Sequence, residues 1–149
     1  MTKPRFVVCE DGREYFERFQ RFLSASFDLV PAPDYAAARA AADAAAGILL
    51  DLDFRRTPPE RLVGDGDDSS LPAGLDPGAR ARLAETQGIL ILRRLRADGV
   101  RLPAMLFADI DDEAQSRFLV TTLAPLTIVD SRVGLPEIAA RMRAAVGRG

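Results

Sequence analysis

Two short stretches decide the fold of this chain: VVCED at residues 7–11 and ILLDLD at residues 48–53. Each is an apolar run that ends abruptly in carboxylates. Apolar runs without polar alternation are typical of strands buried on both faces, as in a parallel sheet. In open parallel α/β sheets, ligands bind at the carboxyl ends of the strands. We therefore expect Glu10, Asp11 and Asp51 to converge at one edge of the sheet, provided that the two strands are neighbours.

A cluster of three carboxylates has two physical explanations. Like charges held close together are costly unless a hard cation lies between them or the pKa of one carboxyl is raised. The sequence therefore predicts either a site for a hard metal ion such as Mg²⁺ or carboxyl groups with shifted pKa values.

The bulk composition limits the class of protein. The chain has 149 residues, of which 48% are hydrophobic and 28% charged, so we expect one globular domain over residues 1–149. The formal net charge of −2 argues against electrostatic binding to nucleic acid or to anionic lipid. No apolar run approaches the roughly 18–20 residues that span a bilayer. Since no signal peptide precedes the first expected strand, we expect a soluble, cytoplasmic protein.

The types of residue that are absent or rare narrow the chemistry. The chain contains no histidine, which removes Ser-His-Asp and Cys-His catalysis, histidine metal sites and a histidine phosphocarrier role. Its single cysteine, Cys9, cannot form an intramolecular disulfide and is interpreted as a small core residue. Any chemistry must therefore use carboxylates, hydroxyls and backbone groups.

Strands and helices are expected in strict alternation. The expected strands are residues 5–9, 27–30, 48–52, 103–108 and 126–129, and helical periodicity or helix caps occur between them. Five such units predict a doubly wound parallel sheet with helices on both faces. The flavodoxin-like strand order 2-1-3-4-5 is the common solution for five strands, and it places the first and third strands side by side.

Residues 55–76 interrupt this alternation. They are rich in Pro, Gly, Asp and Ser and have no sustained period, so we expect a long loop or a mobile insertion between the third strand and the next helix. Asp76 and Pro77 are typical of an N-cap followed by the first helical residue, which predicts a helix from there to about Ala97. Gly88 is a weak point within it and an alternative start.

With these elements in order, the chain resembles the receiver domain of bacterial two-component response regulators over almost its whole length. The resemblance is carried by VVCED at 7–11, LLDL at 49–52, GILILRRLRAD at 88–98 and LP at 102–103. It implies a stand-alone signalling protein of a two-component, phosphorelay pathway. It implies no enzyme beyond self-phosphorylation and dephosphorylation at one aspartate.

The resemblance also assigns roles to the acidic residues. In that family an acidic pair binds Mg²⁺, and the aspartate of the third strand attacks a phosphoryl donor and becomes an acyl phosphate. By position, Glu10 and Asp11 correspond to the metal-binding acids. Asp51 corresponds to the phosphoacceptor, which also contacts the metal, and Asp53 would contribute its backbone carbonyl to the ion.

Three positions depart from the family pattern. The lysine that contacts the phosphoryl oxygens aligns with Asp130, the Ser or Thr after the fourth strand with Ala108, and the aromatic residue of the fifth strand with Thr127. Two like charges about 4 Å apart repel by roughly 4 kcal/mol at an effective dielectric near 20, so an aspartate in place of lysine opposes phosphorylation. Arg132, two residues further on, is the candidate substitute cation.

Three functions remain open at this point. The first is an atypical pseudo-receiver that docks to a protein partner independently of phosphorylation, through the face that this family commonly uses: fourth helix, fifth strand and fifth helix. The second is a working Mg²⁺-dependent response regulator that a histidine kinase phosphorylates at Asp51. In that case Arg55, Arg56 or Arg61 of the insertion could supply a missing cation. The third is a small-molecule binder or a carboxylate–Mg²⁺ hydrolase at the same edge. A homodimer is compatible with all three.

Several of these residues also have a plainer interpretation. Asp11, with Glu14 three residues later, matches a capping box, so Asp11 could cap the first helix. Glu10 has no such local role, which favours its placement in a polar pocket. Asp53 is interpreted as a solvated loop acid. The arginines of the third helix are interpreted as a solvated helix face that could also dock an acidic partner: Arg80, Arg82, Arg93, Arg94 and Arg96.

Overall fold

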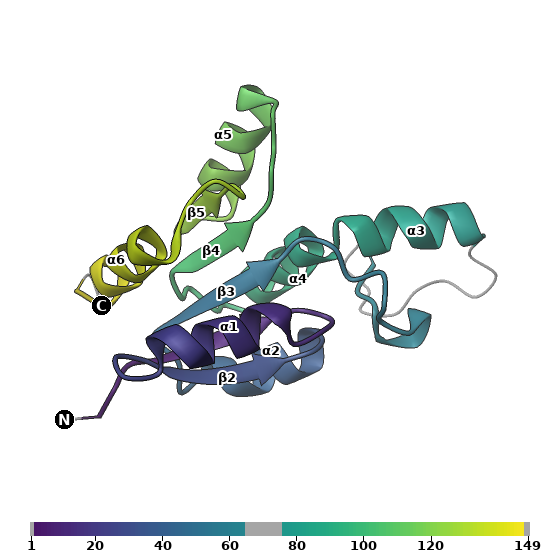
Figure 1. Cartoon of the computed structure of the whole chain (residues 1–149). Helices are drawn as coiled ribbons and strands as arrows, with labels where there is room; N and C mark the ends of the chain where they lie inside the picture. Colours follow the sequence, from purple (N-terminus) through teal and green to yellow (C-terminus); the bar gives the residue numbers. More distant parts are fainter. Residues whose placement is uncertain (1, 65–75, 148–149) are drawn as a thin grey trace.

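The computed structural model describes residues 2–64 and 76–147. It contains a parallel five-stranded sheet in the order β2-β1-β3-β4-β5, which confirms the predicted fold class (Figure 1). The strands are β1 (Arg5–Cys9), β2 (Asp28–Ala32), β3 (Gly47–Asp51), β4 (Ala104–Phe107) and β5 (Leu126–Val129).

Helices alternate with these strands along the chain. They are α1 (Glu14–Leu23), α2 (Tyr35–Ala42), α4 (Gln87–Ala97), α5 (Glu113–Thr122) and α6 (Leu135–Gly147). The connection between β3 and α4 adds a 3-10 helix, η1 (Pro59–Arg61), and α3 (Pro77–Glu85). In Figure 1 this connection extends from the end of the sheet toward which β3 points. None of the helices in the described residues has the length and apolar character needed to cross a bilayer.

The core lies on both faces of the sheet because the central strands are apolar in consecutive positions. In β1, Val7 and Cys9 belong to one buried cluster, and Phe6 and Val8 belong to the other. Apolar residues of α2, α4 and α5 complete the first cluster, while those of α1 and α6 complete the second. Burial of a large apolar side chain stabilises the fold by roughly 1.5–3 kcal/mol.

The helix predicted over residues 77–97 is two helices. The break falls at Thr86, whose φ of −118° and ψ of 16° are not helical, and α4 begins one residue before Gly88. Gly88 lies against the end of β3, where its N–H donates to the carbonyl of Leu52 at 2.9 Å. Both predicted starts are therefore confirmed: α3 begins at Pro77 after the Asp76 cap, and α4 begins next to Gly88, where the chain meets β3.

The first part of the predicted insertion is packed onto the core. Phe54, Leu62 and Val63 are buried. The amide of Gln87, at the start of α4, accepts from the N–H of Val63 at 2.6 Å and donates to its carbonyl at 3.0 Å. We call residues 54–63 the anchored segment. Residues 65–75 of the predicted insertion lie outside the described residues.

A buried arginine holds the connection between α5 and β5. Arg96 in α4 is only 7% exposed, and its guanidinium donates to the carbonyls of Leu123, Val100 and Pro125 at 2.8–3.0 Å. Burial lowers the pKa of Arg96 to about 10. The interpretation of this arginine as part of a solvated helix face is therefore wrong, since its charge is satisfied by backbone carbonyls.

Candidate functional site

The carboxyl edge of the sheet brings the predicted acids together. In the register of β1 and β3, Cys9 lies opposite Leu50, so Glu10 and Asp51 follow at the same level. A surface depression of about 390 Å³ lies over this edge. Its lining residues are Glu10, Glu14, Tyr15, Arg18, Asp51 and Arg56. The depression is polar and mixed in charge.

Glu10 forms the N-terminal cap of α1. It is 3% exposed, and its two carboxylate oxygens accept the N–H groups of Tyr15 at 3.1 Å and Phe16 at 2.7 Å. These N–H groups belong to the first turn, where the helix itself offers no acceptor. Burial raises the pKa of Glu10, and the two N–H groups oppose that rise. The expectation that Glu10 has no local structural role is therefore wrong.

Asp11 does not form the predicted capping box. Helix α1 begins after Arg13, which provides no side-chain cap. The carboxylate of Asp11 instead accepts from Arg56, through the backbone N–H at 2.8 Å and through Nη2 at 3.1 Å. Its side chain is 4% exposed. Asp11 therefore links the end of β1 to the anchored segment.

The guanidinium of Arg56 also pairs with Glu14. Nη1 donates to Oε1 at 2.7 Å and Nη2 donates to Oε2 at 3.1 Å, a two-pronged pairing that matches the planar fork of arginine to a carboxylate. This pairing lowers the pKa of Glu14 to about 2. Arg56 thus connects two carboxylates, one buried and one exposed. From the sequence, Arg56 could be given only as one of three candidates for a missing cation, together with Arg55 and Arg61.

Asp51 is half-buried at the end of β3. Its Oδ1 accepts the N–H of Leu52 at 2.9 Å. Burial is the main cause that raises its pKa to about 6, with additional contributions from the charges of Asp11 and Glu10. The second explanation offered for an acid cluster, a shifted pKa, therefore applies to this residue.

The remaining predicted positions lie beside Asp51 or beyond β5. Asp53 accepts from Arg55 at 2.6 Å, so it is engaged by its own neighbour in the loop. Asp130 and Arg132 pair with each other at 3.0 Å, and Arg132 is 88% exposed. Arg132 therefore neutralises Asp130, and the cation that pairs with Asp11 is Arg56 of the anchored segment.

The two other departures from the family pattern lie just after β4 and within β5. Ala108 directly follows β4; it is buried, and its N–H donates to the carbonyl of Val129 at 3.0 Å. Thr127 is exposed in β5 and pairs with Met105 in the register. Ala108 has a methyl group where a hydroxyl is expected, so this position offers no side-chain hydrogen bond.

The residues present do not fit a Mg²⁺ ion in this arrangement. Both oxygens of Glu10 and both oxygens of Asp11 accept N–H groups, and Asp51 has one oxygen engaged by Leu52. Within residues 2–64 and 76–147, no group of three His, Cys, Asp or Glu side chains is arranged to hold a metal ion. The arrangement fits a guanidinium group instead, and Arg56 supplies it.

Solved structures similar to this one cover nearly the whole chain. The receiver domain of the Francisella response regulator 1452 has a TM-score of 0.65 at 15% identity, with 98% of each chain covered. The signal receiver domain of a putative Luxo repressor protein from Vibrio parahaemolyticus has a TM-score of 0.66 at 11% identity, covering 99% of this chain and 92% of that one.

A response regulator receiver domain from Clostridium thermocellum has a TM-score of 0.66 at 11% identity, covering 97% of this chain and 95% of that one. No protein-family model and no curated protein matches the sequence. The likeness therefore lies in the structure, and it extends over the five β–α units that the sequence predicts. The chain has the fold of response-regulator receiver domains.

Proposed function

We propose that this receiver-fold protein signals by docking to a protein partner and does so independently of phosphorylation at Asp51. The observation that carries the proposal is the turn after β5. Where the family has a lysine against the phosphoryl group, this chain has Asp130, which is tied to Arg132 by the backbone N–H at 2.8 Å and by the guanidinium. That position therefore contributes a carboxylate and no free cation.

The charges around Asp51 support the same conclusion. A phosphoryl group on Asp51 would add roughly two negative charges beside the carboxylates of Glu10 and Asp11. Two arginines line the depression with Asp51: Arg18, and Arg56, which is already engaged by Asp11 and Glu14. Stabilising the added charge with Arg56 would therefore require an existing ion pair to break.

The two side chains that link the phosphoryl group to the docking face in this family are also replaced. In this chain that face corresponds to α5, β5 and α6. In the family, a hydroxyl after the fourth strand follows the phosphoryl group, and an aromatic residue on the fifth strand moves with it. Ala108 and Thr127 occupy these positions, so neither the hydroxyl nor the aromatic ring is present. We therefore expect the face made of α5, β5 and α6 to keep one conformation.

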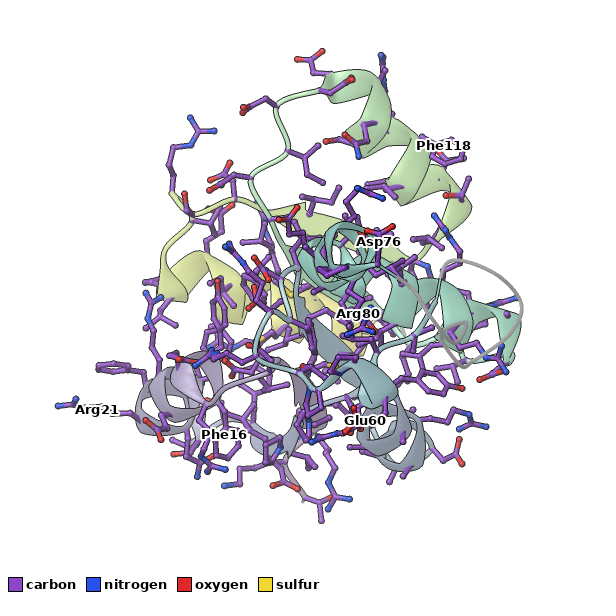
Figure 2. All side chains as sticks on the ribbon, turned by 90° about the vertical axis from the view of Figure 1, so that its right-hand side faces the viewer. Phe16, Arg21, Glu60, Asp76, Arg80 and Phe118 are labelled. Carbon is purple, nitrogen blue, oxygen red and sulfur yellow. The ribbon has the colours of Figure 1, made fainter. Side chains whose placement is uncertain are left out.

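Helix α5 carries an exposed apolar side chain suited to contact with a protein. Phe118 is 60% exposed and projects from α5 at the margin of the molecule in Figure 2. Exposed aromatic residues are enriched in the centres of protein interfaces.

Hydrogen exchange with a phosphoryl mimic tests the proposal. The wild-type protein and the Asp51→Asn variant are each measured with Mg²⁺ alone and with Mg²⁺ plus beryllofluoride. We expect beryllofluoride to leave the exchange of α5, β5 and α6 unchanged in each of the two proteins. Protection that changes on this face in the wild-type protein only, and only with beryllofluoride, would favour the alternative of a response regulator phosphorylated by a histidine kinase.

A further inference from the structure

We infer that Arg56 is a built-in replacement for a divalent cation and that it keeps metal ions out of the acid cluster. The inference concerns regulation of the same edge, and it rests on the proposed function in treating Asp51 as a site no longer driven by phosphorylation. The inference is based on the contacts of the Arg56 side chain. Arg56 belongs to the anchored segment, which is not among the stretches that carry the resemblance to receiver domains.

The guanidinium is held on two sides. It donates to Asp11 at 3.1 Å and to both oxygens of Glu14 at 2.7 and 3.1 Å, and the Arg56 backbone N–H adds a contact to Asp11 at 2.8 Å. Asp11 is almost fully buried, so its charge needs a partner inside the protein. Arg56 meets this need within the chain, as a metal ion would meet it from solution.

The anchored segment is held beside the acids by contacts other than the ion pair of Arg56. At one end, Phe54 is fully buried and its N–H donates to the carbonyl of Ala84 at 2.8 Å. At the other end, both backbone groups of Val63 bond the side chain of Gln87. Because packing holds the segment at both ends, the arginine loses little conformational freedom when it binds the carboxylates.

Gly12 provides the space that the guanidinium occupies. A Cβ atom at this position would overlap Nη2 of Arg56 and a carboxylate oxygen of Glu14. Gly12 lies between Asp11 and α1, and because it has no side chain, Arg56 can approach Asp11. This is a second observation, independent of the hydrogen bonds, that the site is shaped for Arg56.

Arg56 and a divalent ion exclude each other at this site. Mg²⁺ requires near-octahedral oxygen ligands, and both oxygens of Asp11 are engaged by Arg56. An ion bound there would also lie beside a fixed positive charge. Binding of a metal therefore requires the guanidinium to leave, so removal of the arginine should open the cluster to the ion.

Titration with Mg²⁺ alone tests this inference on the unphosphorylated protein. Isothermal titration calorimetry and thermal unfolding are carried out on the wild type, Arg56→Gln and Arg39→Gln. The control, Arg39→Gln, removes an equal charge from α2, where Arg39 pairs with Asp43, the residue that follows the helix. We expect Arg56→Gln alone to bind Mg²⁺ about tenfold more tightly or better than the wild type, and to show a metal-dependent rise in Tm.

A second variant, Gly12→Ala, keeps the arginine but removes its space, and it should gain Mg²⁺ binding in the same way. Equal Mg²⁺ affinity of the wild type and Arg56→Gln would overturn the inference, and so would a failure of both variants to bind. The outcome of this titration does not decide the proposed function. That proposal is tested by the response to a phosphoryl mimic, and this titration contains none.

Discussion

Gly88 in α4 lies directly against the carbonyl group of Asp51 at the end of β3. A Cβ atom at Gly88 would overlap the carbonyl oxygen of Asp51, and it would lie 2.9 Å from the carbonyl carbon and 3.0 Å from the Cα of Leu52. This contact sets how closely the start of α4 approaches the strand that carries the central acid of the site. The glycine is therefore required for close packing.

Gly88→Ala should destabilise the protein despite the higher helix propensity of alanine. Alanine in a helix is favoured over glycine by about 1 kcal/mol, but the new methyl group meets backbone atoms that cannot move aside independently. We expect the free energy of unfolding to fall by about 1–3 kcal/mol in urea denaturation. Gly147→Ala, where a Cβ meets nothing within 4 Å, is the control and should be nearly neutral.

Glu10→Ala should loosen the start of α1. The substitution leaves the N–H groups of Tyr15 and Phe16 without their acceptor, and loss of a helix cap costs about 1–2 kcal/mol. Hydrogen exchange of these two amides should accelerate, with and without Mg²⁺. Glu17→Ala removes an exposed pair with Arg13 and should leave both amides unchanged. Unchanged protection in Glu10→Ala would contradict the capping role.

Arg96→Met should be strongly destabilising. The substitution removes a donor from three carbonyls: Pro125 keeps the N–H of Ala104 and Val100 keeps a contact with Arg101, but Leu123 is left without its donor. A buried acceptor without a partner costs about 1–3 kcal/mol, and we expect a loss of this size in the free energy of unfolding. Arg93→Met, on an exposed position of α4, should change it by less than about 0.5 kcal/mol. Similar losses in the two variants would show that Arg96 is not a structural clamp.

Asp51→Asn should stabilise the protein at neutral pH and lose that advantage in acid. The pKa of Asp51 is raised from 3.8 to about 6, mainly by burial, so the protonated carboxyl favours the folded state. This contribution is fully present below pH 3.8 and is lost as the pH rises through about 6.

Asparagine removes the charged form and keeps an acceptor for the N–H of Leu52. At pH 7.5 the variant should therefore unfold with a free energy higher by on the order of 1 kcal/mol, after allowance for solvent screening of a half-buried group. The difference should shrink as the pH is lowered toward 4. A difference that does not change over this interval would mean that the pKa of Asp51 is not raised.

Much of the fold could be predicted because it depends on local patterns. Consecutive apolar residues marked the central strands, and alternation of strands and helices led to the strand order. That order then placed Glu10 and Asp51 at one edge. The sequence predicts a helix start at Gly88 only as an alternative to one continuous helix. The contact that causes the break is with the end of β3, more than thirty residues earlier in the sequence.

The site could be predicted less completely, because its partners come from distant segments. The pairing of Arg56 with Asp11 joins positions 45 residues apart, and no local pattern separates Arg56 from Arg55 and Arg61. The capping role of Glu10 had one signal in the sequence. The residue before α1 is Arg13, whose side chain offers no acceptor, so the acceptor had to come from elsewhere.

Intact-mass analysis tests the central claim most directly. The wild-type protein and Asp51→Asn are incubated with Mg²⁺ and a small phosphodonor such as acetyl phosphate, and their masses are compared. Independence from phosphorylation predicts no phosphoryl adduct on the folded wild-type protein. An adduct that forms on the wild type and is absent from Asp51→Asn would contradict the account and identify a working phosphoacceptor.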